Sequence, residues 1–173
     1  MQSQTTTRRQ ATLFLRAHLL VDGLRREFNA EQARLIASHV TLCREDEVSD
    51  WEQLAQRLES LRPQQVTLDF GMPCREDNLV YLPCVGSTYE FDHLRAILLN
   101  TSSSIARPHK PHITIIHARN GTCDNSIFER VSSQCRPFSA TFHEVSFIEQ
   151  TNGGIWTVLN QFPLSDRSRE RVS

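Results

Sequence analysis

The sequence predicts an α+β fold made of two similar lobes, related by an approximate two-fold axis. Segments with the alternation of a strand and segments with the spacing of a helix follow one another along the chain. Each half of the chain shows the order strand, helix, strand, helix, strand. In both halves the second strand contains a His-x-Thr tripeptide, His39-Val40-Thr41 in the first and His112-Ile113-Thr114 in the second. The repeated order and the repeated tripeptide indicate two matching lobes.

The first half contains five predicted elements. Residues 11–21 are mainly apolar with polar positions between, which predicts a strand. Residues 24–37 carry apolar side chains at roughly helical spacing, and we expect one helix there. The short segment 38–44 predicts the strand that holds the first tripeptide. A helix at 51–61 and a strand at 64–72 complete this half.

The helix predicted at 51–61 has recognisable ends. Ser49 is the predicted N-cap, because a side-chain oxygen there can accept from the free backbone N–H groups of the first turn. Glu52 lies three residues later, as a capping box requires. Pro63 ends the helix, because proline lacks a backbone N–H and its ring clashes with the preceding turn.

The second half begins in the same way. Residues 78–85 predict a strand, and 88–100 predict an amphipathic helix. The serine-rich and proline-containing segment 101–108 predicts a loop. The second tripeptide then lies in a predicted strand at 112–116, and a helix follows at 124–134.

Two strands close the chain. Residues 137–149 predict one long strand, Asn152-Gly153-Gly154 predicts a hairpin turn, and 155–164 predict the returning strand. We expect residues 1–173 to form a single domain with interleaved lobes, with flexible ends at about 1–10 and 166–173.

Composition excludes several classes of protein. The hydrophobic and charged fractions, 39% and 23%, are those of a globular protein, and a net charge of −1 supplies no overall positive field for long nucleic acid. No apolar run approaches the ~20 residues of a membrane helix. The cysteines are odd in number and contain no C-x-x-C pair, which favours reduced thiols and a cytoplasmic protein. These cysteines are Cys43, Cys74, Cys84, Cys123 and Cys135.

The two tripeptides are the candidate active site. Residues i and i+2 of a strand share a face, so His39 lies beside Thr41 and His112 beside Thr114. The apolar residues between them point to the opposite face. If the lobes face each other, both His-Thr pairs line one cleft.

This constellation suits hydrolysis of a phosphodiester without a metal. An imidazole has an unperturbed pKa of ~6.5, so one can take a proton from water while the other gives one to the leaving oxygen. In-line displacement needs these two groups on opposite sides of the phosphorus. A threonine hydroxyl two residues along can donate to a non-bridging phosphate oxygen. Each lobe thus offers one proton-transfer group and one oxyanion donor.

Several basic residues near the second tripeptide are candidates for binding a phosphate or a metal. Lys110 is a candidate phosphate contact because it lies so close to His112, whereas we interpret Arg107 as part of a solvated loop. His109, His112 and His117 invite a metal site, but their spacing does not suit a strand and no carboxylate pair is close by. We therefore expect neither a metal nor a cofactor.

The chain resembles a known family at these residues. His39-Val40-Thr41-Leu42 and His112-Ile113-Thr114-Ile115 resemble the paired H-x-T/S-x motifs of the 2H phosphoesterase superfamily. The Lys110-Pro111 lead into the second motif and the closing Phe162-Pro163-Leu164 are similar to its "2′-5′ RNA ligase" branch, which includes RNA 2′,3′-cyclic phosphodiesterases. The resemblance spans nearly the whole chain and implies antiparallel sheets with outer helices around a central cleft.

The resemblance also implies an activity. It implies hydrolysis of the 2′,3′-cyclic phosphate of an RNA end or a small nucleotide to a 2′-phosphate. By position, His39 would protonate the leaving 3′-oxygen, His112 would activate water, and Thr41 and Thr114 would hold the phosphate oxygens. Near symmetry permits the opposite division between the histidines. We expect a monomer with no membrane partner.

Three alternatives stay open. The bond could be a 2′-5′ linkage, as in 2′-5′ oligoadenylate, or the substrate could be ADP-ribose 1″,2″-cyclic phosphate. The cleft could instead belong to a non-catalytic module that binds phosphate-ended RNA.

Overall fold

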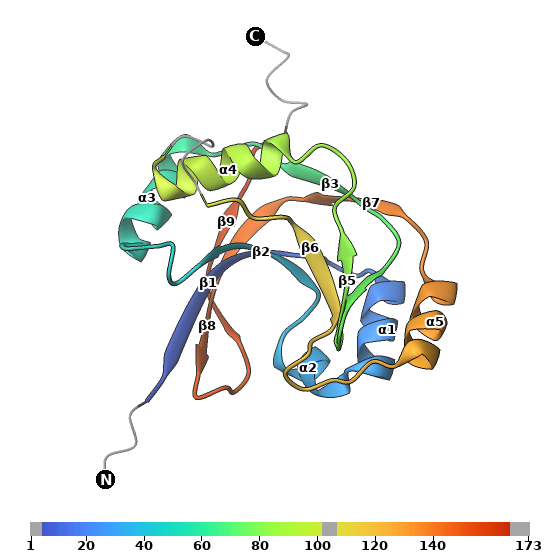
Figure 1. The fold of residues 1–173 in the computed structure, drawn as a ribbon. Coiled ribbons are helices and arrows are strands. Elements are labelled where there is room, and N and C mark those ends of the chain that lie inside the picture. The colour runs from blue at the N-terminus through green and yellow to red at the C-terminus, as the bar shows by residue number, and fades with distance from the viewer. Residues whose placement is uncertain (1–4, 102–106, 167–173) are drawn as a thin grey trace.

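A computed structural model describes residues 5–101 and 107–166 and has an α+β fold of two lobes (Figure 1). The first lobe is built on a four-stranded antiparallel sheet of order β2-β1-β8-β9. Its strands are β1 (Thr7–Phe14), β2 (His39–Arg44), β8 (Glu144–Thr151) and β9 (Thr157–Pro163).

The second lobe is built on a three-stranded antiparallel sheet of order β4-β5-β6. Its strands are β4 (Cys74–Glu76), β5 (Leu79–Pro83) and β6 (His112–Ile116). A separate antiparallel pair, β3 (Val66–Phe70) with β7 (Phe138–Phe142), completes the strands of the described residues.

The helices form two groups outside the sheets. Figure 1 shows α1, α2 and α5 beside the three-stranded sheet, and α3 and α4 beside the four-stranded sheet. Their bounds are α1 (Leu19–Phe28), α2 (Ala30–Leu35), α3 (Trp51–Leu61), α4 (Tyr89–Leu99) and α5 (Asn125–Gln134). Between residues 5–101 and 107–166, no helix is both long and apolar enough to cross a bilayer.

Each lobe takes elements from both halves of the chain. Helix α1 precedes β2 in the sequence but packs on β6 of the other sheet, and α4 precedes β6 but packs on β2. Strands β8 and β9, from the end of the chain, extend the sheet that β1 and β2 begin. The two repeats of the sequence are therefore interwoven in space and do not form separate halves.

The two motif strands are equivalent in detail. From the histidine onward, β2 and β6 share the same alternation of half-buried and buried residues, ending in two consecutive buried positions. The pairing of β2 with β1 and of β6 with β5 shifts register three residues after each histidine. Leu42 and Ile115, at these positions, have no paired residue on the adjacent strand. Both of these side chains are fully buried. A shared bulge at the same position supports the two-fold relation between the lobes.

Several predicted elements are confirmed. The motif strand at 112–116 and the helix at 51–61 have the predicted bounds, and β2 starts one residue later than predicted. The turn at Asn152 and Gly153 has positive φ at both residues, as a tight hairpin turn requires. In the predicted loop at 101–108, residues 102–106 lie outside the described part of the chain, and so do 1–4 and 167–173 of the predicted flexible ends.

The first strand was predicted to begin four residues too late and to end seven residues too late. Strand β1 begins at Thr7, so 7–10 belong to the sheet and not to a loose end. Residues 19–21 are the start of α1, because Ala17 has a left-handed φ of 52° and the His18 ring accepts from Val21 N at 3.3 Å. Leu19 is 81% exposed. Its apolar character led the prediction to extend the strand.

The predicted single helix at 24–37 is two helices. Asn29, at φ −152°, separates α1 from α2. Its side chain donates to Asn120 O at 3.0 Å and accepts from His117 N at 2.9 Å. These contacts come from a segment far away in the sequence, so local spacing could not reveal the break.

One further strand prediction was wrong in its extent, and one strand was not predicted. The predicted strand at 137–149 breaks at His143 into β7 and β8, which belong to different sheets. The short strand β4 was missed altogether, because three residues of mixed polarity carry no usable alternation.

The N-cap of α3 is Asp50 and not the predicted Ser49. The Asp50 carboxylate accepts from the backbone N–H groups of Glu52 and Gln53, at 3.0 Å each. A carboxylate is favoured there because it also complements the positive end of the helix dipole.

Replacing Asp50 with Ala should lower the free energy of unfolding by about 1 kcal/mol, because two N–H groups lose their acceptor. Ser49→Ala is the matched control, and it should change the free energy by less than about 0.5 kcal/mol. Urea unfolding of both variants checks this. Equal losses in the two variants would show that Ser49 contributes to the cap.

Candidate active site

The two His-Thr pairs lie on neighbouring strands. Strands β2 and β6 contact each other where the two lobes meet (Figure 1). The histidines and threonines of both motifs are half-buried, whereas the residues between them, Val40 and Ile113, are fully buried in the core. The strand period thus presents each His with its Thr on the face away from the core.

Both motif histidines are held by the same local hydrogen bond. His39 Nδ1 lies 2.8 Å from Ala37 O, and His112 Nδ1 lies 2.9 Å from Lys110 O. A carbonyl oxygen only accepts, so Nδ1 carries a proton in both rings. The Nε2 atom is therefore the nitrogen left free for acid–base chemistry on each ring.

An aromatic ring supports each of these imidazoles from the adjacent strand. Phe14 meets His39 edge to face with ring centroids 6.2 Å apart, and Tyr81 meets His112 in the same way at 5.4 Å. The Tyr81 hydroxyl donates to the Glu76 carboxylate at 2.7 Å, so the tyrosine is itself held in place. These contacts restrict the rotation of both imidazoles.

A buried arginine anchors the chain that leads into the first motif. Arg25 is 3% exposed and donates to Ile36 O at 2.8 Å and to Ser38 Oγ at 3.2 Å. Ser38 in turn donates to the Asp22 carboxylate at 2.6 Å. Because Ser38 directly precedes His39, this network fixes where the first motif begins.

A second buried arginine joins the two motif strands. Arg95 is 2% exposed, pairs with Glu47 at 2.7 Å, and donates to Leu42 O of β2. It also donates at 3.0 Å to Arg107 O, in the segment that leads into β6. One side chain thus contacts β2 and the approach to β6 together.

Both arginines were missed by the sequence analysis, although the sequence carries a signal for them. Val21, Leu24, Arg25 and Phe28 follow the spacing of a core-facing helix stripe, and α4 repeats that spacing with an arginine in the same place. The corresponding residues of α4 are Phe91, Leu94, Arg95 and Leu98. An arginine within an apolar stripe is buried, and buried charge must be paired.

Burial lowers the pKa of His39 to about 4, and the electrostatic effects of Arg25, His112 and His117 act in the same direction. The hydrogen bond with Ala37 opposes this shift. The His39 ring is therefore neutral near pH 7 in the free protein, with Nε2 able to accept a proton.

His109 lies three residues before His112, and we predicted no role for it from the sequence. Its ring stacks on Phe91 at 6.0 Å and lies 6.1 Å from the His112 ring. Burial, with Arg95 and Arg44 nearby, lowers the pKa of His109 to about 4. Its Nε2 atom is buried and has no hydrogen-bond partner among the described residues.

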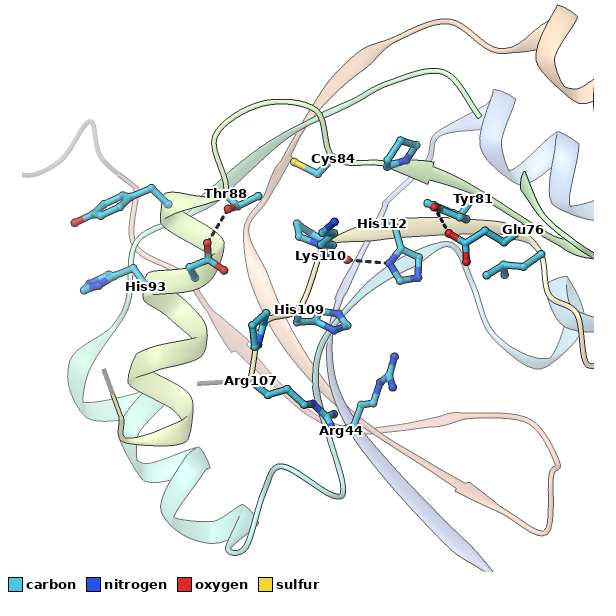
Figure 2. A pocket seen from close by; sticks show the side chains of 16 residues that line it. Arg44, Glu76, Tyr81, Cys84, Thr88, His93, Arg107, His109, Lys110 and His112 are labelled. Carbon is cyan, nitrogen blue, oxygen red and sulfur yellow. Dashed lines mark hydrogen bonds between the residues drawn. The ribbon is translucent and has the colours of Figure 1, made fainter. Parts of the chain in front are cut away.

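A cleft of about 1320 Å³ opens beside the second motif (Figure 2). His112 and the predicted phosphate contact Lys110 line it, together with Arg44 at the end of β2. His39, Thr41 and Thr114 do not line this cleft but lie on the adjoining strands β2 and β6. Arg44 is a lining residue that the sequence analysis did not single out.

The expectation that both His-Thr pairs line one cleft is met by His112 alone, and the two motif strands contact each other but belong to different sheets. Among residues 5–101 and 107–166, no group of three His, Cys, Asp or Glu side chains is arranged to hold a metal ion. The imidazoles of the site can transfer protons, and its hydroxyl, guanidinium and ammonium groups can donate hydrogen bonds.

Comparison with known proteins supports the fold. A family model described as the 2′-5′ RNA ligase superfamily matches residues 14–154, which include both motifs. Apo LigT from E. coli has a TM-score of 0.60 at 18% identity, covering 92% of this chain and 98% of that chain. E. coli LigT complexed with 3′-AMP gives 0.60 at 19% identity, with the same coverage.

A solved structure described as a phosphoesterase has a TM-score of 0.58 at 17% identity, covering 92% of this chain and 99% of that chain. At these identities the likeness concerns the fold. A search of curated protein sequences finds no match.

The lowered pKa of His109 predicts a pH-dependent stability. As pH falls from 6.5 toward 4, His109 binds a proton in the unfolded state but not in the folded state. The free energy of unfolding therefore falls over this range. His109→Gln cannot titrate, and its stability should fall less over this range. Urea unfolding at several pH values compares the two proteins. Parallel curves would show that His109 is not desolvated in the folded state.

Proposed function

The chain belongs to the 2′-5′ RNA ligase superfamily, among the 2H phosphoesterases, and from this membership we propose that it hydrolyses 2′,3′-cyclic phosphates of RNA ends or small nucleotides to 2′-phosphates. His39 and His112 act as the acid–base pair, and Thr41 and Thr114 bind the phosphate oxygens. The whole chain acts as one domain, since each lobe depends on elements from both halves.

One observation carries the proposal. Two histidines on equivalent strands each have Nδ1 held by the carbonyl two residues earlier, which leaves two free Nε2 atoms. A single such histidine could be structural. Two in the same geometry, each with a threonine on the same face, match the needs of in-line displacement at phosphorus.

The reaction needs one base and one acid. One imidazole takes a proton from water as the water oxygen bonds to phosphorus. The other imidazole gives its proton to the 3′-oxygen as the P–O3′ bond breaks, leaving the phosphate on the 2′-oxygen. The threonine hydroxyls donate to the non-bridging oxygens, whose charge grows in the transition state. Proton exchange with solvent restores both rings.

We assign the base to His39 and the acid to His112. The lowered pKa of His39 keeps its Nε2 unprotonated near pH 7, as a base must be. This reverses the division that family resemblance implies by position. The near symmetry of the two strands permits this reversal, because either ring can face the attacking water.

The ligand is proposed to be a nucleotide. E. coli LigT, whose fold this chain shares, has been solved in complexes with 3′-AMP and with ATP. A 2′-5′ phosphodiester is the second candidate substrate, because the matching family model is named for 2′-5′ RNA chemistry. The same acid–base pair could hydrolyse that bond.

Replacing either His39 or His112 with Ala should lower kcat by about 10²–10⁴, because each variant lacks one proton-transfer group. The substrates are a 2′,3′-cyclic mononucleotide, an oligonucleotide ending in a cyclic phosphate and a 2′-5′ dinucleotide, all with EDTA present. His143→Ala, an exposed histidine outside the cleft, is the matched control and should keep wild-type activity.

Three outcomes of this assay would count against the proposal. Activity restored only by added metal would contradict the two-histidine mechanism, and so would full activity in either variant. Tight RNA binding without any product would indicate a binding module in place of an enzyme.

The assignment of acid and base has its own test. A cyclic substrate with sulfur in place of the bridging 3′-oxygen has a better leaving group, which needs little protonation. His112→Ala should regain at least about tenfold of its lost activity on this substrate, while His39→Ala should not. Rescue of His39→Ala alone would show that the division by family resemblance is the correct one.

A further inference from the structure

The cleft beside His112 extends over one face of the three-stranded sheet. Strand β5 is the middle strand, and its half-buried residues Leu79, Tyr81 and Pro83 alternate with buried ones. All three line the cleft. Paired residues of adjacent strands point to the same face, and Pro83 pairs with His112. The cleft therefore continues from His112 over a largely apolar strip of β5.

A carboxylate lies at the far end of this strip. Glu76 of β4 pairs with Leu79 of β5 and also lines the cleft. Its Oε1 atom accepts from the Tyr81 hydroxyl at 2.7 Å, and the Tyr81 ring lies 5.4 Å from the His112 ring. Figure 2 shows Tyr81 and Glu76 together beside His112. The Glu76 carboxylate is therefore one aromatic ring away from the proposed acid.

This carboxylate has capacity for a ligand. Glu76 is exposed, and it forms no ion pair within residues 5–101 and 107–166. The adjacent cation, Arg75, donates instead to Asp77 O and to Asn125 Oδ1, at 2.8 Å each. A carboxylate accepts up to about four hydrogen bonds, and the Tyr81 hydroxyl supplies one. The group that suits the remaining positions carries N–H or O–H donors.

The proposed substrate restricts where those donors can be. In a 2′,3′-cyclic nucleotide both vicinal ribose oxygens are bonded to phosphorus, so neither carries a hydrogen. The donors that remain are the 5′-hydroxyl and the N–H groups of the base. Among the four RNA bases, guanine alone has two adjacent donors on one edge, N1–H and the 2-amino group. These two donors match the two oxygens of a carboxylate.

The other bases fit a carboxylate less well. Adenine and cytosine each place an unprotonated ring nitrogen beside the amino group, and its lone pair would face a carboxylate oxygen. Uracil has a single N–H between two carbonyl oxygens. A carboxylate at this position therefore discriminates between bases through repulsion as well as attraction.

We propose that this end of the cleft is a base subsite, in which the Glu76 carboxylate accepts from N1–H and the 2-amino group of guanine. The preferred substrate is then a guanosine 2′,3′-cyclic phosphate, with its base on the strip of Leu79 and Tyr81. This inference rests on the proposed function, which places the phosphate at His112. The Tyr81 hydroxyl orients the carboxylate before the base arrives, so less order must be created on binding.

Asp92 supplies a matched control. It is the other carboxylate that lines the cleft, and it accepts from the Thr88 hydroxyl at 2.6 Å at the start of α4. Asp92 is thus held by α4, whereas Glu76 is held by Tyr81 beside His112. Asp92→Asn and Glu76→Gln each keep an oxygen for the neighbouring hydroxyl and replace the other oxygen with a donor.

Binding of the reaction product tests the subsite separately from catalysis. The probes are the 2′-phosphates of guanosine, inosine, adenosine, cytidine and uridine. Titration calorimetry should show the guanosine nucleotide binding at least about tenfold tighter than the adenosine, cytidine or uridine nucleotide, because only guanine makes the bidentate contact. The inosine nucleotide keeps N1–H but lacks the 2-amino group, and its affinity should lie between.

Glu76→Gln should remove the preference for guanosine over adenosine, because the amide nitrogen carries hydrogens where the carboxylate accepted. The Tyr81 hydroxyl keeps its acceptor in this variant, so the support of His112 is retained. Asp92→Asn should preserve the preference. Ratios of kcat/KM for the four cyclic mononucleotides should follow the same pattern, and ratios between bases remove any effect of a variant on the phosphate.

The outcomes separate the two proposals. Equal affinity for all bases would overturn the base subsite while leaving hydrolysis of cyclic nucleotides intact. A guanosine preference that persists in Glu76→Gln, or disappears in Asp92→Asn, would also overturn it. So would an equal loss of affinity for every base in Glu76→Gln, because the carboxylate would then bind the 5′-hydroxyl. Glu76-dependent binding of guanosine without turnover of any cyclic nucleotide would support the subsite and defeat the proposed hydrolysis.

Discussion

The arrangement of the site depends on two buried guanidinium groups. Arg25 and Arg95 occupy apolar stripe positions on α1 and α4, where an unpaired charge would cost several kcal/mol. Arg95 meets this constraint by pairing with Glu47, and it also donates to Leu42 O and Arg107 O. Arg25 donates to Ile36 O and Ser38 Oγ, while its buried Nε has no partner among the described residues. The packing of α1 and α4 and the positions of the motif histidines are therefore linked through the same two arginine side chains.

The helices also interweave the two repeats of the sequence. Since α1 packs on β6 and α4 on β2, neither repeat completes its own lobe. The two motif strands are most alike at their histidines, where the Nδ1 atoms of His39 and His112 form the same hydrogen bond with the carbonyl two residues earlier. This likeness is lost five residues later, where Arg44 is exposed and His117 is held by Asn29 and Arg119.

Predictions from the sequence are confirmed where local chemistry decides the structure. Alternation located β2 and β6, and helical spacing with Pro63 gave α3 its bounds. Predictions are wrong where a contact between distant segments decides the structure. The break at Asn29 depends on His117 and Asn120, and the long predicted strand at 137–149 divides at His143 because its two parts pair with different strands.

The sequence by itself determined the two His-x-Thr motifs and the face that each presents, because a strand alternates its side chains with a period of two. It also predicted the α+β fold of two lobes. Only the tertiary structure decided which helix covers which motif, that the His39 ring is desolvated, and that Arg44 lies in the same cleft as His112. These features arise from burial and from contacts between distant segments, which no local pattern encodes.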